Sequence, residues 1–149
     1  MLSHIQKLIF TTILITLISC DEQTPCNHTA FIDGKTYLYG ELFSGDCISM
    51  HSNGEVKSSQ KYKEGLDDGE WRFYYNNGQL ETIGWFENGK RIKEWRYYFK
   101  NGNLKYTINY NEGRIEGKSF AFDSIGNKIF EGIYKNDSLV KTIFSSDRN

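Results

Sequence analysis

The sequence predicts an all-β protein built from tandem antiparallel β-hairpin repeats that form an extended, twisted meander sheet. Three observations support this fold class. Glycines recur at a step of 24 residues, aromatic residues recur at the same step, and 15% of the chain is aromatic, a composition that suits pleated strands. Outside the first 20 residues, no stretch places apolar residues at positions i, i+3, i+4 and i+7, the spacing of an amphipathic helix.

The 24-residue step appears in several independent classes of residue. Such a period is typical of proteins whose units stack to bury a continuous core. The recurring positions are Gly54, Gly78, Gly102 and Gly126; Asn53, Asn77 and Asn101; Gly65, Gly89, Gly113 and, in fourth place, Asp137; Gly45, Gly69 and Gly117; Tyr62, Phe86, Tyr110 and Tyr134; Trp71 and Trp95. We expect a repeat domain over residues 34–144, with a leading half-unit at 34–45, four units of which the last is degenerate, and a tail at 145–149.

Residues 71–86 illustrate one unit. Asn77-Gly78 is a signal for a two-residue type I′ turn, because both central positions of that turn need a positive φ. The predicted cross-strand pairs are Tyr75 with Leu80, Phe73 with Thr82, and Trp71 with Gly84. An indole lying over a glycine would cover an otherwise bare stretch of strand. A lone hairpin is marginal in water, so stacked neighbours must supply the burial.

Both faces of the predicted sheet carry aromatic residues. The first face holds Trp71, Phe73, Tyr75, Leu80 and Phe86, and the opposite face is mixed, with Arg72, Tyr74, Glu81, Ile83 and Trp85. A single sheet cannot bury both faces unless something covers the second one. We therefore expect a binding face around Tyr74, Ile83, Trp85 and Tyr98 that contacts a partner protein or an envelope glycan. The alternative is that these aromatics only fill the hydrophobic face of the sheet.

The first 19 residues are predicted to be a signal peptide. A polar start with Lys7 precedes an apolar run from Leu8 to Ile18, which is too short to cross a bilayer as a helix. Residues 17–20, Leu-Ile-Ser-Cys, resemble the bacterial lipobox, which implies cleavage before Cys20 and lipidation of its thiol. The alternative is an ordinary signal peptide with a chance cysteine. Residues 20–33 are then the lipidated cysteine and a linker, and the chain is expected to be exported and anchored to the membrane through its lipid.

The position of the anchor within the envelope stays open. Acidic residues directly after the lipidated cysteine, here Asp21 and Glu22, resemble an inner-membrane retention signal in one group of bacteria and a surface-export signal in another. A composition rich in Asn, Lys, Ile and Tyr favours the second. The outer membrane or the cell surface is therefore favoured, and the periplasmic side is the alternative.

The two cysteines of the predicted mature chain, Cys26 and Cys47, would meet an oxidising compartment after export. A bridge between them would pin the linker to the first strands, and two free thiols are the alternative. No metal site is expected, because His28 and His51 show no ligand spacing. No cofactor is expected either.

The unit at residues 68–90 resembles the MORN repeat variant of YwqK-type proteins, and the resemblance covers about residues 34–140. The matching positions are Gly69, Trp71, Tyr74, Tyr75, Asn77, Gly78, Leu80, Phe86 and Gly89, and the pattern recurs from Trp95 to Gly113. Lys93, where the pattern has glycine, and Ser119, where it has tryptophan, depart from it. The resemblance implies a twisted antiparallel sheet of successive hairpins. Members are often labelled antitoxins, and many are exported lipoproteins.

These features predict a non-enzymatic protein. Catalysis needs a nucleophile beside a base or paired titratable groups in a pocket, and the acidic residues are scattered over turns. Formal charge is −1, or −2 without residues 1–19, which carry Lys7 and no acid, so a nucleic-acid partner is not expected. The predicted function is binding or scaffolding in the cell envelope. The alternatives are an antitoxin or immunity protein that neutralises a cognate toxin, and a structural envelope spacer.

Two serines lie in short sequences that resemble an O-glycosylation signal of exported bacterial proteins. These are Ser124, in Asp-Ser-Ile, and Ser138, in Asp-Ser-Leu. Both fall at predicted turns, where a sugar could be attached. Because turns are rich in Asp and Ser anyway, the alternative is that neither serine is modified.

Overall fold

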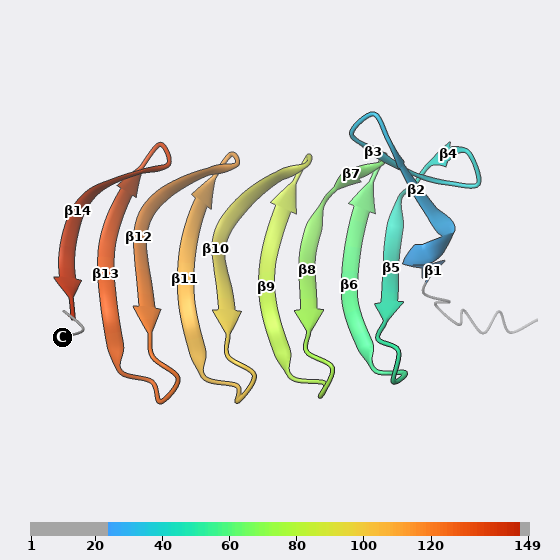
Figure 1. The fold of residues 1–149 in the computed structure, drawn as a ribbon. Coiled ribbons are helices and arrows are strands. Elements are labelled where there is room, and N and C mark those ends of the chain that lie inside the picture. Colours follow the sequence, from blue (N-terminus) through green and yellow to red (C-terminus); the bar gives the residue numbers. More distant parts are fainter. Residues whose placement is uncertain (1–23, 147–149) are drawn as a thin grey trace, which may run out of the picture.

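The computed structural model describes residues 24–146 and contains one long sheet, antiparallel except at its first strand, and one small sheet (Figure 1). The strands are β1 (Thr24–Pro25), β2 (Thr29–Ile32), β3 (Lys35–Leu38), β4 (Glu41–Leu42), β5 (Gly45–Met50), β6 (Val56–Lys63), β7 (Leu66–Asp67), β8 (Gly69–Tyr74), β9 (Leu80–Glu87), β10 (Lys90–Tyr98), β11 (Leu104–Asn111), β12 (Arg114–Phe122), β13 (Lys128–Lys135) and β14 (Ser138–Ser145), with a short 3-10 turn, η1 (Cys26–His28), after β1.

The long sheet has 11 strands in the order β1-β5-β6-β8-β9-β10-β11-β12-β13-β14, with β7 paired to β6, and β2-β3-β4 form the small sheet. From β5 onward the strands follow one another in chain order, as the short glycine turns require, except that β7 and β8 both pair with β6. Figure 1 shows the long sheet as a single, open layer of strands. The predicted all-β meander of 24-residue units is confirmed.

The two ends of each hairpin use different turns, and the type I′ turn lies at the opposite end from the one predicted. At Asn77-Gly78 only the glycine has a positive φ, of 80°, and the Gly78 amide donates to the Tyr75 carbonyl over 2.9 Å. This is a three-residue loop built on a type I turn with a left-handed glycine. Two-residue turns with two positive φ values occur instead at the return, as in Asn88 (49°) and Gly89 (77°).

The cross-strand register is confirmed at two of the three predicted pairs. Phe73 lies opposite Thr82 and Trp71 opposite Gly84, but Leu80 lies opposite Tyr74 rather than Tyr75, because the register shifts after Phe73. The longer loop explains this error. The Tyr75 amide donates to the Gln79 carbonyl over 2.8 Å, so Tyr75 closes the loop and does not extend the strand.

An indole does lie over Gly84, but it belongs to the following strand. A Cβ added at Gly84 would lie 2.0 Å from Cδ2 of Trp95, whereas Trp71 was the predicted cover. Trp95 is only 3% exposed, and its Nε1 donates to the Trp85 carbonyl over 3.2 Å. Trp71 donates in the same way to the Lys61 carbonyl over 2.9 Å, so these two tryptophans both pack back toward the preceding unit.

A ladder of aromatic rings forms the core of the long sheet and runs across its strands. Neighbouring ring centroids lie 4.8–6.0 Å apart along the series Phe43, Tyr62, Trp71, Phe86, Trp95 and Tyr110. We call the side of the sheet that carries this ladder the aromatic face. Tilted and edge-on contacts of this kind add to the burial of apolar area, so the ladder links the units into one core.

Hydrogen bonds tie each hairpin end to the corresponding end of the next unit. At the three-residue loops, side-chain amides donate to a carbonyl 23 residues onward, and the bonds are Asn53–Asn76 (2.7 Å), Asn77–Lys100 (3.4 Å) and Asn101–Ser124 (2.8 Å). At the two-residue turns, glycine amides donate to a carbonyl of the preceding unit over 2.8 Å, and the bonds are Gly65–Phe43, Gly89–Asp67 and Gly113–Arg91. The repeated Asn and Gly positions are thus explained by contacts between units.

The departures from the repeat pattern have different consequences. Lys93 adopts a φ of 61° at the position where Gly45, Gly69 and Gly117 also have positive values, so the strand keeps its bend at some cost in backbone energy. Ser119, in the tryptophan position, donates its hydroxyl to the Thr107 carbonyl over 2.6 Å. The unit geometry persists at both sites.

The N-terminal segment differs from the prediction. The expected linker is structured from Thr24, because β1 pairs in parallel with β5 and a disulfide joins Cys26 to Cys47. The expected leading half-unit does not extend the long sheet. It is split into β3 and β4 by a tight turn at Tyr39 and Gly40, whose φ values are 52° and 88°.

The C-terminal end also extends slightly beyond expectation. Ser145, placed in the tail by the sequence, is the last residue of β14. The Ser146 amide still donates to the Ile129 carbonyl over 3.0 Å. The predicted signal peptide and residues 147–149 lie outside the described residues.

Candidate binding face

The four residues predicted to form a binding face lie on the same side of the long sheet, opposite the aromatic face. Ile83 pairs with Arg72 on one side and with Arg96 on the other, and Trp85 pairs with Glu70 and Ile92. Tyr74 and Tyr98 follow the two arginines by two residues on β8 and β10. We call this side, around Tyr74, Ile83, Trp85 and Tyr98, the mixed face.

Two similar rows of polar side chains cross the mixed face. On β8, Nε of Arg72 lies 2.7 Å from Glu70, and on β10 Nε of Arg96 lies 2.7 Å from Glu94. Hydrogen bonding to Tyr74 raises the pKa of Arg72, and the adjacent Glu94 raises that of Arg96. Both guanidinium groups therefore remain charged beside a tyrosine, which leaves aromatic surface bordered by paired charges.

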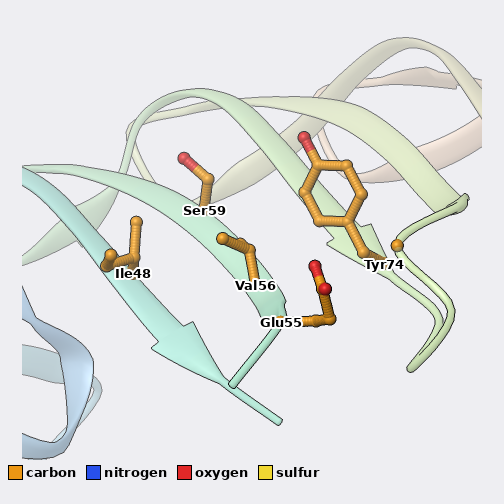
Figure 2. A pocket seen from close by; sticks show the side chains of 6 residues that line it. Ile48, Glu55, Val56, Ser59 and Tyr74 are labelled. Atoms are coloured by element: carbon orange, nitrogen blue, oxygen red, sulfur yellow. The ribbon is translucent and has the colours of Figure 1, made fainter. Parts of the chain in front are cut away.

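A hollow of about 380 Å³ lies at one end of the mixed face. Figure 2 shows Ser59 of β6 and Tyr74 of β8 on the same side of the sheet, with Ile48 and Val56 beside them and Glu55 at the rim. The strands are loosely joined here, because β6 and β8 pair at only two positions, Ser58–Phe73 and Ser59–Arg72. The hollow combines an aromatic ring, apolar side chains, a hydroxyl and a carboxylate.

Comparison of the units explains why this hollow lies in the first one. The residues 24 positions after Ser59 and Ile48 are Ile83 and Arg72. In the second unit, the larger Ile83 side chain occupies the place of the Ser59 hydroxymethyl group, and Arg72 extends along the strand toward Tyr74. The first unit therefore leaves open the space that the second unit fills.

A second hollow, of about 340 Å³, is lined by Pro25, Asn27, Ile48, Ser49 and Met50 and shares Ile48 with the first hollow.

His51 lies close to the hollow beside Tyr74, and its ring is hydrogen-bonded to the backbone. Its Nε2 lies 2.8 Å from the Tyr74 carbonyl oxygen, just as the Tyr75 hydroxyl donates to the Tyr98 carbonyl over 2.7 Å. His51 thus takes the same place in its unit as Tyr75. Among residues 24–146 no group of three or more His, Cys, Asp or Glu side chains could hold a metal ion.

The remaining predicted site residues are placed as follows. Cys20 lies outside the described residues. Cys26 and Cys47 form a disulfide, with Cys47 fully buried. Ser124 is exposed in the loop between β12 and β13, whereas Ser138 is exposed at the start of β14 and not within a turn. Within the described part of the chain, no helix is long and apolar enough to span a membrane.

The hollow itself was not predicted from the sequence. Of its lining, which comprises Ile48, Glu55, Val56, Ser59, Tyr74 and Gly78, only Tyr74 was expected to bind. The sequence did carry one signal: Ser59 and Ile48 stand where the next unit has the larger Ile83 and Arg72. This difference can be interpreted only once the strand register is known, because the register decides which of the recurring positions share a face.

The hairpins between β7 and β11 match a known repeat. The MORN repeat variant matches the chain twice, at residues 67–88 and at residues 91–112. These two segments are similar to the MORN repeat variant. The MORN match begins just before β8 and includes both rows of the mixed face. MORN repeats are generally non-enzymatic and indicate a repeat protein that binds or scaffolds. No curated protein matches the chain.

Proposed function

We propose that this chain is a non-enzymatic, membrane-anchored repeat protein of the bacterial cell envelope, which binds a partner protein or an envelope glycan through its mixed face. The observation that carries the proposal is the combination, on one side of a single-layer sheet, of aromatic side chains and a hollow (Figures 1 and 2). Aromatic side chains beside a pocket are the usual anchors of a binding surface.

The chemistry of the hollow favours a polar occupant without negative charge. Glu55 at the rim would repel an anion, and the nearby Arg72 is already paired with Glu70 over 2.7 Å. The Tyr74 ring can stack on a sugar ring or on an apolar side chain. The Ser59 hydroxyl and the Glu55 carboxylate can accept hydrogen bonds from hydroxyl groups. A sugar ring or a polar side chain of a partner protein meets both requirements.

Binding is tested with the full-length chain in its membrane. After mild cross-linking, capture of wild-type protein should recover a specific partner or glycan. Replacing Tyr74 and Trp85 with Ala should lower that recovery at least about tenfold, because anchors of this kind dominate binding energy. Tyr39→Ala is the matched control, since Tyr39 is exposed on the small sheet away from the mixed face. Unchanged recovery by a folded Tyr74→Ala/Trp85→Ala variant would reject the proposed face.

Anchoring is tested separately at Cys20. Each buried methylene of an acyl chain contributes about 0.8 kcal/mol to membrane affinity, so loss of the lipid should release the protein. We expect Cys20→Ser to move the chain from the membrane fraction to the soluble fraction. Mass spectrometry of the wild-type N-terminal peptide should detect an acylated cysteine. A mature chain that starts elsewhere or carries no lipid would contradict the anchor and leave the binding face untouched.

The identity of the captured partner also separates the antitoxin alternative from a scaffold. A toxin bound in a fixed ratio, and inhibited by the wild-type chain but not by the Tyr74→Ala/Trp85→Ala variant, would favour an immunity function. A structural envelope component recovered by the same face would favour scaffolding. Both outcomes rest on the same surface.

A further inference from the structure

The outer edge of β14 is open and apolar. β14 is the last strand in the order of the long sheet, and no strand among residues 24–146 pairs with its outer side. Four of its side chains are large, apolar and exposed: Leu139 (46%), Val140 (57%), Ile143 (46%) and Phe144 (39%). An exposed strand of this composition is a template for another strand.

The repeat geometry indicates which part of β14 would pair. One unit earlier, β12 pairs with β13 through residues Gly117–Phe122. The corresponding residues of the last unit, 24 positions onward, are 141–146. The bulges of β14 against β13 do not preclude a second partner, because β12 also bulges, against β11, and still forms its ladder with β13. The edge thus repeats a pairing surface that is occupied in the preceding unit.

The opposite end of the long sheet does not offer such an edge. β1 pairs in parallel with β5 at Thr24–Cys47 and Pro25–Ile48, and the Cys26–Cys47 disulfide fixes η1 against the same strand. Head-to-tail joining of two chains through β14 and β5 is therefore blocked. A second copy can still offer its own β14, and that contact closes after two chains.

We propose that two copies of this chain pair antiparallel through β14 and join their long sheets into one. A two-fold axis perpendicular to the sheet would keep each aromatic face on the same side. A register centred on Ile143 sets that residue opposite its own copy and sets Lys141 opposite Ser145 of the second copy, which avoids a like-charge pair. The interface is small, so the dimer should be weak in solution and favoured when both chains share a membrane.

The test measures the mass of the purified full-length protein, kept in detergent, by light scattering over a range of concentrations. The wild type should shift from monomer to dimer as the concentration rises to about 100 μM, the range expected for a small interface. Ile143→Lys should abolish the dimer, because the two introduced charges would oppose each other. Ile125→Lys is the control, since Ile125 is also an exposed isoleucine, at 79%, in the loop before β13, and this variant should still dimerise.

A milder variant keeps the test valid if Ile143→Lys fails to fold. Ile143→Thr preserves β-propensity while removing apolar contact, and it should weaken the dimer with the same circular dichroism spectrum as wild type. A wild-type chain that stays monomeric, or a dimer that both Ile143 variants leave unchanged, would overturn the proposal. It does not depend on Cys20 or on the mixed face, so it can fail while the proposed function stands.

Discussion

Replacing Gly84 with Ala is expected to destabilise the protein by about 3 kcal/mol, the upper range for overpacking a well-filled core. The added methyl group would overlap the Trp95 indole, whose Cδ2 lies 2.0 Å from the ideal Cβ position. Trp95 cannot move aside freely, because its ring contacts both Phe86 and Tyr110 in the aromatic ladder. Urea unfolding followed by tryptophan fluorescence measures the loss.

A double-mutant cycle separates this steric effect from a general loss of glycine. Trp95→Ala alone should cost about 3–5 kcal/mol, since it removes a large buried ring. In that background Gly84→Ala should add little, because the clashing group is gone. Strong coupling between the two substitutions is therefore expected. Additive losses would contradict the contact between the indole and the glycine.

The fold was predictable because its information is local and repeated. Turn residues such as Gly78 and Gly89 recur at a constant step, and a constant step of turns leaves little choice of topology. The predicted pairs of Phe73 and Trp71 were confirmed for the same reason. Type I′ geometry was assigned to the wrong end of the hairpin, because Asn-Gly fits both turns. The φ values and the hydrogen bond from Gly78 to Tyr75 distinguish the two turns.

The features that the sequence did not reveal depend on contacts between units. Trp95 rather than Trp71 covers Gly84. The reason is the direction in which the Trp95 side chain packs across the neighbouring strand, and strand pairing alone does not determine that direction. The hollow beside Tyr74 likewise depends on Ser59 and Ile48 meeting on one face. The predicted binding residues were brought together because side chains two apart on a strand share a face.

Loss of the Cys26–Cys47 disulfide is expected to lower the free energy of unfolding by about 3 kcal/mol, the chain-entropy value for a loop of this length. The two cysteines are 21 residues apart in sequence. Cys47 is fully buried in a cluster with Phe43 and Tyr62, and Cys26 packs against that cluster. The bridge thus holds β1 and η1 against β5 at the N-terminal end of the aromatic ladder.

The double variant Cys26→Ala/Cys47→Ala, unfolded in urea, checks this value, and reduction of the wild type provides an independent control. Dithiothreitol should shift the wild-type transition toward that of the variant and leave the variant unchanged. Because β1 pairs with β5 at only two positions, hydrogen exchange should also rise first in residues 24–28 when the bridge is absent. A wild-type transition that is insensitive to the reductant, together with an equally stable variant, would show that the bridge does not hold this end of the sheet.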